Sequence, residues 1–133
     1  MIRPVDARHV QERDRWPLEL AEAALAYAGE AKLVSGKSAG SLAAPFAAEH
    51  GLAAVWTTPL LDHSQCADGL RARTAPVLLV GGTADESWPG ELARELADEV
   101  LELAGADHGL TRASDLEQVE RAVAAFSARV LRA

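Results

Sequence analysis

The chain has 133 residues, a length that fits one domain built around one core. Hydrophobic residues make up 49% of the sequence, and the net charge of −7 disfavours nucleic acids and anionic membranes as partners. No run approaches the roughly 20 consecutive apolar residues that a membrane span needs, and the N-terminus lacks the apolar segment of a signal peptide. The single cysteine, Cys66, excludes an intramolecular disulfide, so these features together predict a cytoplasmic protein.

Apolar runs and helical periodicities alternate along the first part of the chain. Residues 2–5 predict a short strand, which Pro4 restricts to an edge or an end of a sheet. A helix opening at Pro17 and ending at Gly29 follows, with one apolar face. That face carries Leu18, Ala21, Leu25 and Ala28. Ala31–Ser35 predicts a buried strand, and residues 39–49 predict a helix that bends near Pro45.

The same alternation continues to the C-terminus. Three further strands are expected at Ala53–Thr57, Pro76–Val80 and Glu99–Leu103. Pro89 opens one helix, and a capping box of Ser114 and Glu117 opens the last. The last helix has an apolar stripe of Leu116, Val119, Val123, Phe126 and Val130. We therefore expect an α/β fold over residues 1–133, with a parallel sheet of about four to five strands flanked by helices on both faces.

The stretch Gly36-Lys37-Ser38-Ala39-Gly40 has the Gly-x-Ser-x-Gly pattern, between a predicted strand and a predicted helix. A sharp turn at this place lifts the serine hydroxyl out of the backbone as a potential nucleophile. The two glycines are expected to remove side chains where the strand and the helix pass closely. Ser38 is therefore the candidate nucleophile, although a lone serine here is also a common helix cap.

A serine nucleophile needs a general base and a group that orients the base. His108 directly follows the last predicted strand, and Asp85 directly follows the strand before it. Because the carboxyl ends of parallel strands meet at one edge of a sheet, Ser38, Asp85 and His108 are expected to gather there. Asp62, Asp68 and Asp107 are weaker candidate acids, and His9, His50 and His63 are weaker candidate bases.

The ordered motifs Gly36-Lys37-Ser38-Ala39-Gly40, Gly81-Gly82-Thr83-Ala84-Asp85 and Asp107-His108-Gly109 resemble those of the α/β-hydrolase superfamily. The chain looks most similar to its small esterase-like, dienelactone hydrolase-related group. The resemblance implies a Ser38–His108–Asp85 triad, with the backbone N–H of Ala39 as one oxyanion donor.

The N-terminal part departs from the superfamily pattern. Further strands normally precede the helix before the elbow, and one of their loops supplies a second oxyanion donor. Here only residues 2–5 stand in that place, so the chain is expected to be a truncated version of the fold. The strand at Ala31–Ser35 would then have an open edge, which a homodimer or another partner would cover.

Two functions remain open at this point. The first is a cofactor-free serine hydrolase acting on a small ester or related acyl substrate. The second is a non-catalytic binding or assembly module with an incomplete α/β-hydrolase fold. A phosphate-binding loop is disfavoured because Ala31 occupies the position of its first glycine. No spacing of Cys and His indicates a metal site, and Lys37 is either a solvated side chain or a contact for an anionic substrate group.

Overall fold

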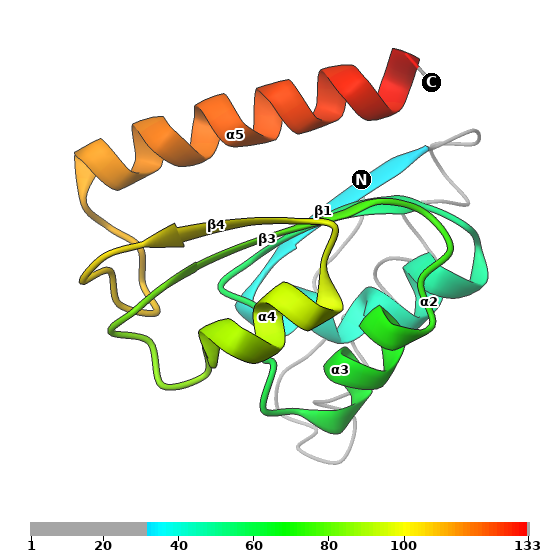
Figure 1. Cartoon of the computed structure of the whole chain (residues 1–133), viewed down its shortest axis with the longest axis horizontal. Helices are drawn as coiled ribbons and strands as arrows, with labels where there is room; N and C mark the ends of the chain where they lie inside the picture. Colours follow the sequence, from blue (N-terminus) through cyan, green and yellow to red (C-terminus); the bar gives the residue numbers. More distant parts are fainter. Residues whose placement is uncertain (1–31, 133) are drawn as a thin grey trace, which may run out of the picture.

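The structure, a computed structural model, describes residues 32–132 (Figure 1). Its strands are β1 (Leu33–Lys37), β2 (Ala53–Thr57), β3 (Val77–Gly82) and β4 (Glu99–Leu103). They form one parallel sheet in the order β1-β2-β3-β4. The helical elements are the 3₁₀-helix η2 (Ser38–Ala43) and the α-helices α2 (Ala44–Glu49), α3 (Ser64–Arg71), α4 (Gly90–Leu96) and α5 (Ala113–Arg132).

Helices cover both faces of this sheet, as the alternating pattern predicted. The long helix α5 crosses one face, and α2, α3 and α4 lie on the other (Figure 1). The predicted α/β fold with a parallel sheet is therefore confirmed. Each strand except the last described one leads through a helical connection to its neighbour in the sheet, which is the arrangement that parallel pairing requires.

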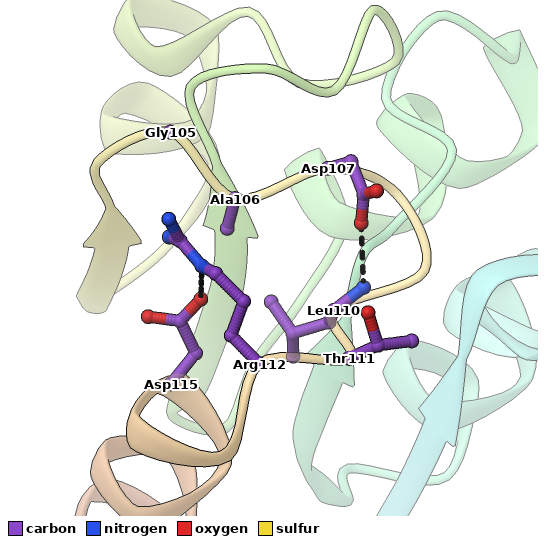
Figure 2. A pocket seen from close by; sticks show the side chains of 7 residues that line it. All are labelled: Gly105, Ala106, Asp107, Leu110, Thr111, Arg112 and Asp115. Carbon is purple, nitrogen blue, oxygen red and sulfur yellow. Dashed lines mark hydrogen bonds and ion pairs between the residues drawn. The ribbon is translucent and has the colours of Figure 1, made fainter.

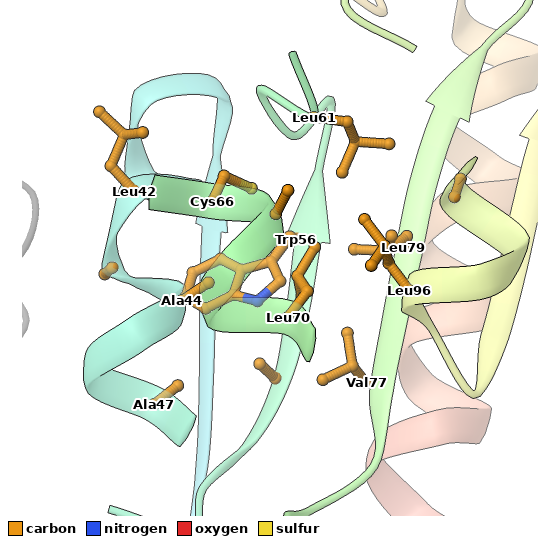
Figure 3. Packing of buried hydrophobic residues seen from close by; sticks show 14 of the residues in the cluster. Leu42, Ala44, Ala47, Trp56, Leu61, Cys66, Leu70, Val77, Leu79 and Leu96 are labelled. Carbon is orange, nitrogen blue, oxygen red and sulfur yellow. The ribbon is translucent and has the colours of Figure 1, made fainter. Parts of the chain in front are cut away.

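The two central strands divide the core into two layers by the period-two alternation of their side chains. On β2, Ala54 and Trp56 face the α2–α3–α4 side, and Val55 faces α5. On β3, alternate residues do the same, and all six are buried. Figure 3 shows the first layer, in which Trp56, Leu70 and Leu79 pack together with small residues of α2. The second layer centres on Phe126 of α5, which is fully buried.

Some element boundaries differ from the predicted ones. The strand predicted at Ala31–Ser35 is β1, which ends at Lys37, directly before Ser38. The helix predicted over residues 39–49 is instead a 3₁₀-helix followed by α2, and Pro45 lies in the first turn of α2 rather than at a bend. Proline suits that position because the first helical N–H groups have no partner within the helix.

Helix α3 was not predicted from the sequence. It is short and mostly polar, and its apolar side is formed by Cys66, Ala67 and Leu70. It packs so closely on α2 that a Cβ on Gly69 would lie 2.4 Å from the backbone nitrogen of Pro45. The glycine in mid-helix, which normally weakens a helix, is thus explained by the helix contact that it permits.

The start of α5 also differs from the prediction. The helix begins at Ala113, so Ser114 lies inside its first turn and the predicted capping box is wrong. Of the predicted apolar stripe, Val119, Val123, Phe126 and Val130 pack in the core, but Leu116 is 43% exposed. The helix therefore meets the sheet one turn later than its sequence pattern indicates.

The predicted strand at residues 2–5 and the predicted helix from Pro17 to Gly29 lie outside the described residues. Within residues 32–132, β1 pairs with β2 along one edge only. In the same range, no helix combines the length and the hydropathy that crossing a membrane requires.

Candidate active site

Ser38 stands at a sharp turn between β1 and η2. Its φ of 53° lies in the left-handed region, which residues other than glycine rarely adopt. The turn needs glycine at position 36, because a Cβ there would lie 2.9 Å from the Trp56 ring. Gly40 does not serve the close approach expected of it, since no described atom lies within 4 Å of a Cβ at that position.

The structure brings Ser38, His108 and Asp85 together at the carboxyl edge of the sheet. Oγ of Ser38 lies 2.7 Å from Nε2 of His108, and Nδ1 of His108 lies 2.7 Å from Oδ2 of Asp85. An ionised carboxylate can only accept hydrogen bonds. In a neutral ring, Nδ1 therefore carries the proton, and Nε2 accepts the hydrogen bond that the Ser38 hydroxyl donates.

The Asp85 and His108 side chains differ in their exposure to solvent. The Asp85 side chain is 2% exposed, whereas the His108 side chain is 41% exposed. The other carboxylate oxygen of Asp85, Oδ1, accepts a hydrogen bond of 2.9 Å from the backbone N–H of Ser87. Asp85 is thus fixed by two partners, and the imidazole that it holds is open to solvent and reachable by a small molecule.

The loops that carry Asp85 and His108 are tied to each other by backbone hydrogen bonds. The N–H of Ala84 donates to the carbonyl of Ala106 at 2.9 Å, and that of Gly105 donates to Oγ1 of Thr83 at 2.7 Å. Gly82 allows this approach, because a Cβ there would lie 2.2 Å from the Ala106 carbonyl oxygen. The presence of glycine at position 82 is therefore explained by this close packing, in addition to the resemblance of the segment to a family motif.

The weaker candidate acids have other structural partners. Asp107 accepts a hydrogen bond from the backbone N–H of Leu110 and closes the turn that contains His108. Asp68 pairs with Arg71 on the surface of α3. Asp62 is exposed, and its negative charge adds to burial, the larger cause, in raising the pKa of the Cys66 thiol.

The other histidines also have structural surroundings, and His9 lies outside the described residues. His50 lies against Phe46, with ring centroids 4.2 Å apart. His63 is the N-cap residue of α3, where its Nδ1 accepts a hydrogen bond from the backbone N–H of Gln65. Trp56 and Trp88 are buried packing residues, and Nε1 of Trp88 donates to Glu102.

Two residues near Ser38 were not identified as structural supports from the sequence. Ser41 is fully buried; its hydroxyl donates to the Ser38 carbonyl at 2.7 Å and accepts from the backbone N–H of Leu60 at 2.9 Å. Nζ of Lys37 donates to the carbonyl of Gly109 at 2.9 Å. The bond from Leu60 to Ser41 and the bond from Lys37 to Gly109 join segments distant in sequence, so no local pattern could have indicated them.

Ala39 is the second residue of η2, directly after Ser38. A backbone N–H at this place has no partner within its helix, since the first turn lacks preceding carbonyls. It therefore has the position expected of an oxyanion donor by resemblance. The N-cap of η2 is Lys37, and its first turn contains no acidic residue.

A small cavity of about 50 Å³ lies beside the loop that carries His108 (Figure 2). Arg112 spans it, pairing with Asp115 at 2.5 Å and donating to the Ala104 carbonyl at 2.7 Å. The Asp115 side chain is 7% exposed. The volume suits a water-sized group rather than an ester. The bonds of Arg112 across the cavity instead hold the start of α5 in place. A wider groove of about 450 Å³ between α2 and α3 contains none of the three candidate residues.

Over residues 32–132, no three His, Cys, Asp or Glu side chains cluster in a way that could hold a metal ion.

Comparison with known proteins gives similarity in structure only. No protein-family model matches the chain, and no curated protein matches it. Solved structures do match. An alpha-beta serine hydrolase homologue from Coxiella burnetii has 20% identity and a TM-score of 0.59, over 71% of this chain and 51% of that one. The monoacylglycerol lipase of Paleococcus ferrophilus has 17% identity and a TM-score of 0.68, over 86% of this chain and 74% of that one.

A third similar structure is the esterase domain of a Rhodothermus marinus protein, with 20% identity and a TM-score of 0.64. The match covers 86% of this chain and 67% of that domain's chain. The chain thus spans about half the length of the Coxiella burnetii homologue and between two thirds and three quarters of the other two. These neighbours show that the chain shares the α/β fold of the three hydrolase structures, of which the described residues contain four parallel strands.

Proposed function

We propose that this chain is a cofactor-free serine hydrolase that acts on a small ester or related acyl substrate. The observation that carries the proposal is the continuous series of hydrogen bonds from Ser38 through His108 to Asp85, each 2.7 Å long. Its support is the geometry of the strained turn at Ser38 and the similarity in fold to a lipase, an esterase domain and a serine hydrolase homologue.

The chemistry follows from the roles of the three side chains. Ser38 Oγ attacks the acyl carbon while Nε2 of His108 takes the hydroxyl proton, and the carbonyl π electrons move to oxygen. The N–H of Ala39 donates to that oxyanion. The tetrahedral intermediate collapses, the C–O bond to the leaving group breaks, and the proton on His108 passes to the leaving oxygen. Water then repeats the sequence on the acyl-enzyme and releases the acid.

Asp85 supports both halves of this cycle. Its buried carboxylate keeps the proton of the neutral imidazole on Nδ1, so that Nε2 is free to accept. It also stabilises the imidazolium that forms when the serine proton has been transferred. The half-exposed ring of His108 leaves room for the leaving group and for the water that follows it.

Labelling with a fluorophosphonate tests the proposal. The probe forms a bond between its phosphorus and Ser38 Oγ, with loss of fluoride. The expected result is one adduct on the wild-type chain, detected by intact mass, and none on Ser38→Ala. Ser114→Ala, which changes an exposed hydroxyl in α5, is the matched control and should label like the wild type. An unlabelled wild-type chain that also turns over no p-nitrophenyl ester would favour the non-catalytic binding module instead.

A further inference from the structure

Lys37 and Gly109 are the immediate neighbours of the two residues that exchange a proton in the proposed reaction. Lys37 is the last residue of β1 and precedes Ser38, and Gly109 follows His108. Nζ of Lys37 donates a hydrogen bond of 2.9 Å to the carbonyl oxygen of Gly109, across 72 positions of sequence. One side chain thus spans from the elbow of the candidate nucleophile to the loop of the candidate base.

The loop between β4 and α5 is attached to the rest of the fold at several places. It is attached to the β3 side through the bond from Ala84 to Ala106, and its end is anchored by Arg112. The bonds from Leu110 to Asp107 close a turn within the loop but do not attach it to β1. The Lys37 ammonium supplies an attachment to the β1 side, next to a histidine whose side chain is 41% exposed.

We propose that Lys37 is a positioning residue that holds the His108 loop against the Ser38 elbow through the Gly109 carbonyl. This inference rests on the proposed function, since it assigns to Lys37 the spacing between the nucleophile and its base. A hydrogen bond with an ionised donor is shorter and stronger than a neutral one. Because the contact is exposed, its effect on global stability is small. Its effect on rate is larger, because a shift of about 1 Å in a reacting group can cost on the order of 100-fold.

The sequence composition makes this contact easy to isolate. Lysine occurs at only two positions of the chain, 32 and 37, and every other basic residue is an arginine or a histidine. Lys32 is exposed and precedes β1. Lys32→Met therefore removes the same charge at the other end of the same strand and serves as the matched control for Lys37→Met.

A competing role for Lys37 is direct contact with an anionic part of the substrate. The two roles predict different kinetics. A substrate contact raises KM for anionic esters and leaves the hydrolysis of neutral esters unchanged, whereas a positioning role lowers kcat for a neutral ester with KM little changed. The probe is therefore p-nitrophenyl acetate, which carries no charge on its acyl part.

The experiment compares wild type, Lys37→Met, Lys37→Arg and Lys32→Met. We expect Lys37→Met to lower kcat about ten-fold while KM stays within about twofold. Lys37→Arg should restore most of the rate, since a guanidinium also donates to a carbonyl. Lys32→Met should match the wild type. Wild-type kcat in Lys37→Met, or a change confined to KM, overturns the proposal.

A second measurement keeps this inference separate from the proposed function. The Nδ1 proton of His108 and the backbone amides of Gly109 and Leu110 are followed by NMR, with hydrogen exchange, in the absence of substrate. We expect Lys37→Met to shift the imidazole signal and to speed exchange at both amides, with unchanged urea unfolding. If the wild type hydrolyses no ester, the proposed function fails. The NMR signals and exchange rates then decide by themselves whether Lys37 positions the His108 loop. Signals identical to the wild type in Lys37→Met overturn the positioning role.

Discussion

Gly82 and Ala106 approach so closely that a Cβ on Gly82 would lie 2.2 Å from the carbonyl oxygen of Ala106. Gly82→Ala should therefore push apart the loops that carry Asp85 and His108. Overpacking of this kind costs about 1–3 kcal/mol in the free energy of unfolding, and ester hydrolysis should fall with it. Urea denaturation and esterase rates measure the two effects. Gly40→Ala, with no described atom near its new Cβ, is the stability control; equal losses in both variants would contradict the steric explanation.

Asp85→Asn should nearly abolish hydrolysis while leaving the chain folded. An asparagine amide can donate to Nδ1, which favours the wrong imidazole tautomer; the equivalent change in a Ser-His-Asp triad lowers kcat by about 10⁴-fold. Steady-state kinetics with p-nitrophenyl acetate measure the loss. Asp68→Asn, which only breaks a surface pair with Arg71, should keep the wild-type rate. A fully active Asp85→Asn enzyme would reject Asp85 as the orienting group.

Acidification should lower kcat/KM of the wild type. A protonated His108 has no free lone pair on Nε2 and cannot accept the proton of Ser38. The measurement is kcat/KM for a neutral ester across the acidic range, with circular dichroism confirming that the chain stays folded. A rate independent of pH down to the onset of unfolding, with chemistry rate-limiting, would exclude His108 as the base.

Cys66 should react slowly with iodoacetamide in the folded protein. Burial raises the pKa of the Cys66 thiol, so little thiolate is present and little of it is accessible. Below the ordinary thiol pKa of about 8.5 both states hold the proton and the full contribution to stability is present. As pH rises toward the higher folded pKa, the unfolded chain loses its proton first and stability declines. Mass spectrometry should show rapid alkylation only after urea is added; equally rapid alkylation of the folded chain would contradict burial.

Phe126→Ala should remove the main contact between α5 and the sheet. Phe126 is fully buried among Val55, Leu78 and Val80, and truncation of a buried phenylalanine costs about 3–5 kcal/mol. Leu131→Ala, at a residue that is 55% exposed, should change stability by less than about 0.5 kcal/mol. Both values come from urea unfolding. Similar small losses in the two variants would show that α5 contributes little to the core.

The edge of β1 that does not face β2 should be covered in solution, because an open strand edge invites further pairing. Within residues 32–132 that edge has no strand beside it. We expect a homodimer, since two-fold pairing is the commonest assembly, and native mass spectrometry at micromolar concentration measures it. A monomer in which the β1 amides exchange slowly would instead show that the chain covers its own edge.

The sequence predicted those parts of the structure that depend on local pattern. The runs at Ala53–Thr57 and Glu99–Leu103 are β2 and β4, with the predicted bounds. For β2 the reason is burial on both faces, which selects a continuous apolar run. Helix α3 could not be predicted because its stability comes from contact with α2 at Gly69, not from its own periodicity.

The candidate site divides in the same way. Ser38, Asp85 and His108 could be selected from the sequence because each follows a predicted strand. The ends of parallel strands meet at one edge of the sheet, so the order of residues along the chain was enough to place the three together. Lys37 donates to the carbonyl of Gly109 and Ser41 accepts from the amide of Leu60, both far away in sequence, so only three-dimensional structure could reveal these two contacts.

The parallel sheet also dictates how late in folding the site can form. No strand here can pair with its neighbour through a short hairpin: Leu33 pairs with Ala53, Ala54 with Val77, and Leu78 with Glu99. Every pairing therefore closes a loop of about 20 residues, which costs chain entropy before any contact is gained, and folds with such high contact order form slowly. Ser38 and His108 come from the first and last of these units, so recovery of labelling after dilution from urea would report completion of the whole sheet and not of any one part.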